Sequence, residues 1–170
     1  MSSPSRIVLV LALGCWICGS AGGQASTTSP EPPILTISGE VSRPSKLTAS
    51  DFAKLPQQTI TAKDHNGQPA TFEGVALSEI LQRAGVEFGE QLRGKNLALF
   101  AVVDAADGYR VVFALPELDP AFANQPVLLA DRREGKALAS NEGPLRIVVP
   151  GVKRQGRWVR QVVAITIKRA

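Results

Sequence analysis

The sequence predicts an α+β domain built on a mixed or antiparallel β-sheet with few short helices. Two observations lead to this prediction. Short segments of β-branched and other apolar residues recur between Gly, Pro, Asn and Asp residues, a pattern typical of strands and turns. Only one or two segments show the period of an amphipathic helix, and they do not alternate regularly with the strands. The length of 170 residues gives room for one such domain with tails.

The N-terminal residues 1–23 have the pattern of a cleavable secretory signal peptide. Arg6 supplies the positive charge, and an apolar stretch follows from Ile7 to Cys18. This stretch has the length of a signal core and is short for a membrane span. Ala21 and Gly23 suit a signal-peptidase site. We therefore expect export to the periplasm or the exterior; a buried N-terminal helix is the alternative interpretation.

Composition indicates where the folded domain begins and which partners it is not expected to bind. Residues 24–33 are rich in Ser, Thr and Pro and predict a disordered linker, which leaves residues 34–170 for the folded domain. Loss of Arg6 with the signal peptide lowers Lys and Arg from 19 to 18, against 15 Asp and Glu, so the net charge is about +3. So small a charge does not indicate nucleic-acid binding. No segment after the signal peptide is long and apolar enough to predict a membrane span.

Several kinds of chemistry are not expected. Both cysteines, Cys15 and Cys18, lie in the predicted signal peptide, so residues 24–170 offer no thiolate and no disulfide. Because His65 is the only histidine, a zinc site with several Cys or His ligands is excluded. Glycine-rich phosphate loops are also missing, and neither a nicotinamide nor a haem cofactor is predicted.

The first half of the domain is expected to form three strands and two helices. The first strand begins at Ile34, bends near Gly39 and is broken by Arg43-Pro44. Ser50 is the expected N-cap of a short helix at 51–55. Strands at 59–63 and 68–72 flank a hairpin turn, because Asn-Gly tolerates positive φ angles. The clearest helix ends at a glycine, Gly85, and carries one apolar stripe made of Leu77, Ile80, Leu81 and Ala84.

The second half is expected to be mostly strands. The segment 97–103 is continuously apolar, which predicts a central strand buried on both faces. A turn at 104–108 leads to a strand in which Tyr109, Val111 and Phe113 alternate. The remaining elements are expected to be a helical turn at 116–122 and strands at 127–130, 145–149 and 162–167.

A basic segment near the C-terminus is the strongest candidate for a binding site. Four cations occur within eight residues, and Gly151 and Gly156 give the backbone freedom to close around an anion. Guanidinium groups bind phosphate or carboxylate in a fork. The alternative is a solvated loop beside an edge strand that is protected by charge. The four cations are Lys153, Arg154, Arg157 and Arg160.

Polar residues in two predicted turns suggest other sites. Asp104 and Asp107 could form a polar cluster at a strand end, where ligands often bind, although Asp commonly caps backbone amides in such turns. His65 would be the only base for a Ser-His-Asp hydrolase, but a polar residue in a hairpin turn is ordinary. No catalytic residue and no metal ligand are therefore assigned.

Five segments, taken in order, resemble the sulfite-oxidase-like oxidoreductase molybdopterin-binding domain family. Residues 143–151 resemble its "G-PLR-VVPG" stretch, and this is the most specific segment. Asp107-Gly108-Tyr109 resembles its "DGY" strand entry. The other resemblances are those of 74–85 to "GVPL..LL..AG", of Leu128-Leu129-Ala130 to the strand before the hairpin, and of Val159-Arg160 with Ile165 to "VKWL..I".

The resemblance implies a sulfite-oxidase-like molybdopterin-binding fold in which basic groups hold the phosphate of a pterin cofactor. Arg160 stands at the place of the family's lysine near that phosphate. Arg157, Arg154 and Lys153 lie in the loop that approaches the cofactor, and Asp107 and Tyr109 would line the edge of the cavity. The implied cofactor is molybdopterin, and the implied ligand is a pterin or another anionic small molecule.

The sequence departs from the family at the metal ligand. The family binds molybdenum through a cysteine near the end of the strand that matches 59–63, and this sequence has none there; Gln161 also replaces an aromatic residue. A hydroxyl or amide does not replace a thiolate well. We therefore expect ligand binding without family-type catalysis. The alternatives are a molybdenum oxidoreductase that uses Asp64 or His65 as ligand, and a non-catalytic module that binds a periplasmic protein. Whether the protein is an enzyme stays open.

Overall fold

The structure is a computed structural model that describes residues 30–170. The predicted signal peptide and residues 24–29 of the predicted linker lie outside the described residues. Residues 30–33 are exposed and belong to no helix or strand, and Glu31 accepts a hydrogen bond from the backbone of Ser50 (3.3 Å). From Glu31 to Ala170 the chain forms one compact unit.

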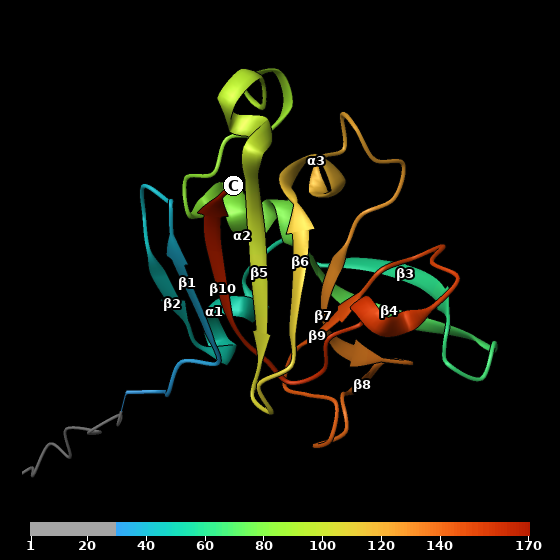
Figure 1. Ribbon diagram of the computed structural model, residues 1–170. Coiled ribbons are helices and arrows are strands. Elements are labelled where there is room, and N and C mark those ends of the chain that lie inside the picture. Colours follow the sequence, from blue (N-terminus) through green and yellow to red (C-terminus); the bar gives the residue numbers. More distant parts are fainter. Residues whose placement is uncertain (1–29) are drawn as a thin grey trace, which may run out of the picture. The chain divides into compact units, whose positions relative to one another are not determined.

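One sheet contains the first and the last strand of the domain side by side (Figure 1). The order is β2-β1-β10-β5-β6, with β1 parallel to β10 and all other neighbours antiparallel. The mixed sheet that the sequence predicts is thereby confirmed. Its strands are β1 (Leu35–Gly39), β2 (Ser45–Leu47), β5 (Leu99–Ala105), β6 (Arg110–Ala114) and β10 (Val162–Arg169).

The second sheet is antiparallel throughout. The order is β3-β4-β7-β8, and β9 pairs with β7 next to the start of that strand. The β3–β4 hairpin turns at Gly67, whose φ of 74° only glycine adopts easily. Its strands are β3 (Gln58–Lys63), β4 (Pro69–Ala76), β7 (Leu128–Arg133), β8 (Lys136–Ala137) and β9 (Arg146–Val148).

Short helices complete the fold: α1 (Ala49–Ala53), α2 (Leu77–Arg83) and α3 (Leu115–Leu118), with 3₁₀ turns at Gly89–Gln91, Gly94–Ala98 and Gln155–Arg157. The apolar stripe predicted on α2 is buried. The predicted N-cap of α1 is wrong by two residues. Thr48 caps the helix because its hydroxyl accepts from the backbone N–H of Asp51 (3.1 Å), and the Asp51 carboxylate accepts in return from the backbone N–H of Thr48 (3.1 Å).

Both sheets contribute to one hydrophobic core. Phe52, Phe72 and Phe113 are its largest buried side chains, and they come from α1, β4 and β6. Where the end of β1 pairs with β10, a Cβ added at Gly39 would overlap the carbonyl oxygen of Ile167. The glycine at which a bend was expected is therefore required by the close approach of two backbones. No helix in residues 30–170 is long and apolar enough to cross a membrane.

Some strand predictions differ from the structure. The strands β2 and β8 were not predicted, because they have only three and two residues and lack an apolar run. The predicted central strand at 97–103 starts two residues later, and Leu97 is exposed in a 3₁₀ turn. That strand, β5, is an interior strand, and the centre of its sheet is β10.

Candidate functional site

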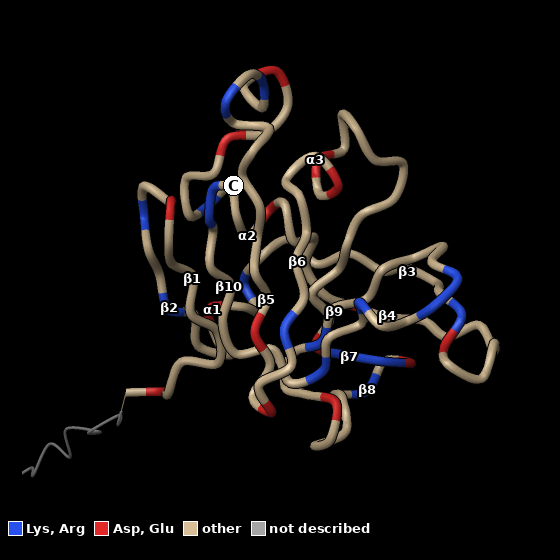
Figure 2. The backbone as a smooth tube through the Cα atoms, viewed as in Figure 1, with Lys and Arg blue, Asp and Glu red and all other residues tan. Residues whose placement is uncertain are grey.

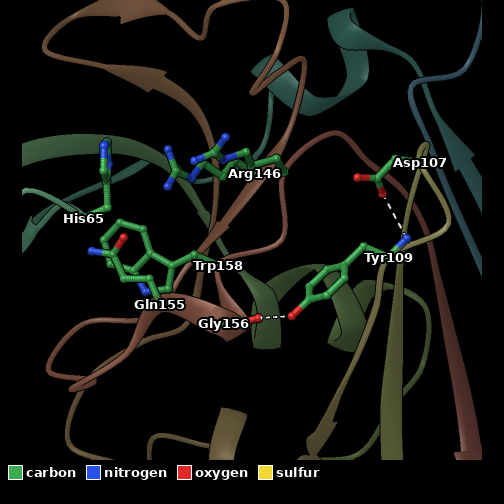
Figure 3. A pocket seen from close by; sticks show the side chains of 8 residues that line it. His65, Asp107, Tyr109, Arg146, Gln155, Gly156 and Trp158 are labelled. Carbon is green, nitrogen blue, oxygen red and sulfur yellow. Dashed lines mark hydrogen bonds between the residues drawn. The ribbon is translucent and has the colours of Figure 1, made fainter.

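A pocket of about 290 Å³ lies where loops from both sheets meet (Figure 3). His65 comes from the β3–β4 turn, and Asp107 and Tyr109 come from the β5–β6 turn. In Figure 3, His65, Arg146 and Trp158 lie on one side of the pocket and Asp107 and Tyr109 on the other. The remaining lining residues are Gln155, Gly156 and Arg160.

Arg146, the first residue of β9, is the most deeply buried charge of the pocket. It is 2% exposed and pairs with Glu142 (2.7 Å). Its guanidinium carbon lies 5.2 Å from the ring centroid of Trp158 and 5.7 Å from that of Phe72. Its Nε has no hydrogen-bond partner among the described residues. An arginine fixed in this way offers a rigid fork to an anion.

Burial lowers the pKa of the Arg146 guanidinium. Glu142 opposes this effect, whereas the positive charge of Arg160 adds to it. Arginine nevertheless stays protonated at physiological pH. The pocket therefore contains two like charges, and a bound anion would relieve the repulsion between them.

Trp158 forms an aromatic wall of the pocket. It is 6% exposed, and its indole Nε1 donates to the carbonyl oxygen of Val149 (2.9 Å). Its ring meets that of Phe72 edge-on, with centroids 5.5 Å apart and planes at 88°. The hydrogen bond and the aromatic contact fix the ring against Arg146.

The β3–β4 turn is held by a buried carboxylate. Oδ1 of Asp64 accepts from the backbone N–H groups of Asn66 (2.8 Å) and Gln68 (3.3 Å), and Oδ2 accepts from Arg133 (2.6 Å). Burial alone would raise the pKa of Asp64, but these hydrogen bonds outweigh it and hold the pKa below its ordinary value. Both oxygens of Asp64 are occupied, and the next residue, His65, is exposed at the pocket.

A second pocket of about 510 Å³ adjoins the first and shares His65 and Gln155 with it. Gln155 Nε2 donates to the carbonyl oxygen of Lys63 (2.6 Å), so the loop before β10 is attached to the end of β3. The pocket's other lining residues are Lys63, Asp64, Gly67, Val152, Lys153 and Arg154.

The structure separates the predicted site residues into three groups. Arg160, Asp107 and Tyr109 line the first pocket, and Lys153 and Arg154 line the second. Arg157 lines neither pocket. Its guanidinium pairs with Glu117 (2.5 Å) and lies 4.2 Å from the ring centroid of Phe113.

The turn residues have structural roles within the site. Asp107 accepts from the backbone N–H of Tyr109 (2.9 Å), as expected for Asp in a turn. The Tyr109 hydroxyl donates to the carbonyl oxygen of Gly156 (2.6 Å) and so attaches the loop before β10 to the β5–β6 turn.

Sequence reasoning missed Arg146, Trp158 and Gln155 as lining residues. A usable signal exists for Arg146, because it is a charge within the otherwise apolar run 145–149 that predicts a buried strand. A buried charge needs partners and often belongs to a site. Trp158 and Gln155 carry no comparable signal, because the loop that places them has no periodic pattern.

The surroundings of both pockets are positively charged. Figure 2 shows many of the basic positions around β7, β8 and β9 and beside the β3–β4 hairpin. Within residues 30–170, four cations at the pockets form no ion pair: Lys63, Lys153, Arg154 and Arg160. No group of three or more His, Cys, Asp and Glu side chains in the same part of the chain is arranged to hold a metal ion. The site can therefore attract and orient an anion.

Comparisons with known proteins identify the fold and the family of this chain. The sulfane dehydrogenase SoxCD from Paracoccus pantotrophus has a similar fold, with a TM-score of 0.62 and 23% sequence identity. The match covers 78% of this chain and 37% of the SoxCD chain, so the present chain spans well under half of that structure. No curated protein sequence matches. The profile of the oxidoreductase molybdopterin binding domain matches residues 65–170, which is more than half of the chain. The chain therefore belongs to the family of oxidoreductase molybdopterin-binding domains, and its fold is the sulfite-oxidase-like fold of that family.

Proposed function

We propose that this protein is exported and binds molybdopterin, or another anionic ligand, without cysteine-ligated molybdenum catalysis. The observation that carries the proposal is Arg146, a buried guanidinium in the wall of a pocket that also contains Arg160. Burying a cation is costly, and one ion pair with Glu142 leaves its Nε without a partner. An anionic ligand would offset that cost.

The residues fit the organic part of molybdopterin. Arg146 and Arg160 would hold its phosphate, and Trp158 and Gln155 offer an aromatic edge and an amide to a pterin. When bound with its metal, this cofactor supplies redox chemistry. The first pocket's walls need only bind and orient the anionic end.

The residues do not fit a metal centre of the family type. Residues 24–170 contain no cysteine, and the end of β3 carries Lys63, Asp64 and His65 instead. Both Asp64 oxygens already accept hydrogen bonds. We therefore assign no redox step to this chain.

A second candidate function rests on the position of His65. Because His65 is exposed and lines both pockets, it could replace the cysteine as a metal ligand in a molybdenum oxidoreductase. This alternative predicts stoichiometric molybdenum that is lost in His65→Ala. A non-catalytic periplasmic interaction module is the third candidate, and it predicts a protein partner recovered by cross-linking and no small ligand.

The deciding experiment measures pterin and metal in protein exported from a host that makes the molybdenum cofactor. We expect pterin fluorescence after denaturation and little molybdenum. Arg146→Gln should remove the pterin, whereas Arg157→Gln, the matched control outside both pockets, should retain it. Stoichiometric molybdenum would favour the oxidoreductase, and absence of both pterin and metal would favour the interaction module.

Export is tested separately by cell fractionation and N-terminal sequencing. We expect the mature protein in the periplasm or the medium, beginning at Gln24. A cytoplasmic protein that still begins at Met1 would contradict the proposal.

A further inference from the structure

We propose that the second pocket is a second anion subsite, so that the ligand is an elongated small molecule with two anionic groups, of the diphosphate class. This inference rests on the proposed function, because the first anionic group would occupy the first pocket with Arg146 and Arg160. The second group would lie between Lys63, Lys153 and Arg154.

The two pockets are contiguous. His65 and Gln155 belong to the linings of both, so a ligand in one pocket can extend past these side chains into the other. Gln155 is held in place by its hydrogen bond to Lys63, and Asp64 holds the turn that presents His65. The shared wall between the subsites is thus fixed by the protein itself.

The second pocket carries unbalanced positive charge. Lys63, Lys153 and Arg154 are exposed and form no ion pair within residues 30–170. Asp64 is the only carboxylate in its lining, and Arg133 already pairs with it (2.6 Å). Three free cations facing one hollow attract an anion more strongly than a neutral group.

The lining also indicates what the second anionic group is. Apart from His65, the second pocket has no aromatic side chain, and its only aliphatic lining residue is Val152. A ring system would find little to stack on there. Flexible lysines act as point charges on phosphate, which suits the outer group of a diphosphate better than a flat carboxylate.

The test compares inorganic phosphate with pyrophosphate by calorimetric titration of the mature protein purified after export of the full-length chain. Pyrophosphate should bind about tenfold more tightly than phosphate. The double variant Lys153→Gln/Arg154→Gln should remove that advantage and leave phosphate affinity within about twofold. Quenching of Trp158, the only tryptophan after residue 23, gives a second readout at the first pocket.

A matched control separates a subsite from general attraction. Lys46→Gln/Arg93→Gln also removes one lysine and one arginine, both exposed, unpaired within the described residues and outside both pockets. It should leave the pyrophosphate advantage unchanged. Equal losses in the two double variants would overturn the inference, because they would show only general electrostatic attraction.

The failure of this inference can be told from failure of the proposed function. If phosphate binds, and Arg146→Gln abolishes that binding, the first pocket is an anion site. The second subsite is then refuted if pyrophosphate shows no advantage or if the advantage survives in Lys153→Gln/Arg154→Gln. Absence of binding by either probe would overturn both proposals.

Discussion

Two regions of the site use positive charge in opposite ways. The floor consists of buried or half-buried groups. Arg133, Arg146 and Trp158 contact the Phe72 ring, and Asp64 and Glu142 are the ion-pair partners of the two arginines. The rim consists of exposed cations without acidic partners in the described part of the chain: Lys63, Lys153, Arg154 and Arg160. Every charged side chain of the floor has an ion-pair partner, whereas the rim cations have none within residues 30–170.

The difference shows how burial changes what an arginine does. Arg133 and Arg146 each place a guanidinium carbon 5.7 Å from the Phe72 centroid, and each has a carboxylate partner. Both positions are fixed, and Arg146, which lines the first pocket, can therefore select a ligand by shape. Arg160 is exposed and can move, so it adds attraction more than geometry.

The largest expected effect comes from removing the ring on which the floor is built. Phe72→Ala should lower the free energy of unfolding by about 3–5 kcal/mol, since Phe72 is fully buried, and should also weaken phosphate binding by releasing Arg146. Leu81→Ala, in the buried stripe of α2, is the control, with a loss of about 2–5 kcal/mol and no change in affinity of the folded protein. Urea unfolding and calorimetry measure the two quantities. Equal affinities in both variants would show that Phe72 does not position the floor.

Breaking one buried pair should have the next largest effect. Arg146→Gln should lower the free energy of unfolding by about 3 kcal/mol, because it leaves the Glu142 carboxylate, 15% exposed, without its partner. The double variant Arg146→Gln/Glu142→Gln should recover about 1 kcal/mol or more of that loss. Chemical denaturation measures both. An equally destabilised double variant would mean that the ion pair is not the source of the loss.

Acid should weaken the floor through Asp64. Because the pKa of Asp64 is lowered in the folded state, its carboxylate adds stability above the ordinary aspartate pKa, and that stability is lost as pH falls through the folded-state pKa. Asp64→Asn should therefore reduce stability at neutral pH and flatten the acid side of the profile. Thermal unfolding between neutral and acidic pH measures the change. Parallel profiles of variant and wild type would contradict it.

Asp131 provides a control in which the pH dependence of stability has the opposite sign to that of Asp64. Burial raises the pKa of Asp131, and its Oδ1 has no hydrogen-bond partner within the described residues. Its charged form is therefore disfavoured in the fold, and stability rises as pH falls through the raised pKa. Asp131→Asn should stabilise the protein at neutral pH in the same thermal assay.

The smallest effect on stability is expected at the rim. Arg160→Gln should change the free energy of unfolding by no more than about 0.5 kcal/mol, since the side chain is exposed and unpaired among residues 30–170. The phosphate affinity of the Arg160→Gln variant should fall about threefold at low salt and approach that of the wild type at high salt. A salt-independent loss would assign Arg160 to the fixed floor.

Much of the fold could be predicted because it depends on local patterns. The stripe on α2, the Asn-Gly hairpin and the strand from 162 follow from periodicity and turn chemistry, and the structure confirms them. The strands β2 and β8 could not be predicted, because their own residues show no strand pattern. They become strands only by pairing with β1 and β7. The N-cap is Thr48 and not Ser50 because Thr48 and Asp51 exchange hydrogen bonds in a capping box, which is a local pattern of two residues three positions apart.

Less of the site could be predicted, because its residues meet only through tertiary structure. The basic loop was a single cluster in the sequence, but the fold distributes it over two pockets and a contact with Phe113. Neighbours along a loop need not point the same way, so spacing alone could not separate Arg157 from Arg160. The family resemblance named Arg160, and the apolar run 145–149 indicates that Arg146 is buried, but only tertiary structure brings these two side chains into one pocket.

The position of β10 has a consequence for how the chain is made. Its sheet has β10 between β1 and β5, so the N-terminal strand has no parallel partner until residues 162–169 have been synthesised. A ribosome-bound chain that lacks those residues cannot complete this sheet, and such long-range pairing is slow. Folding of this sheet is therefore completed only after the whole chain is available.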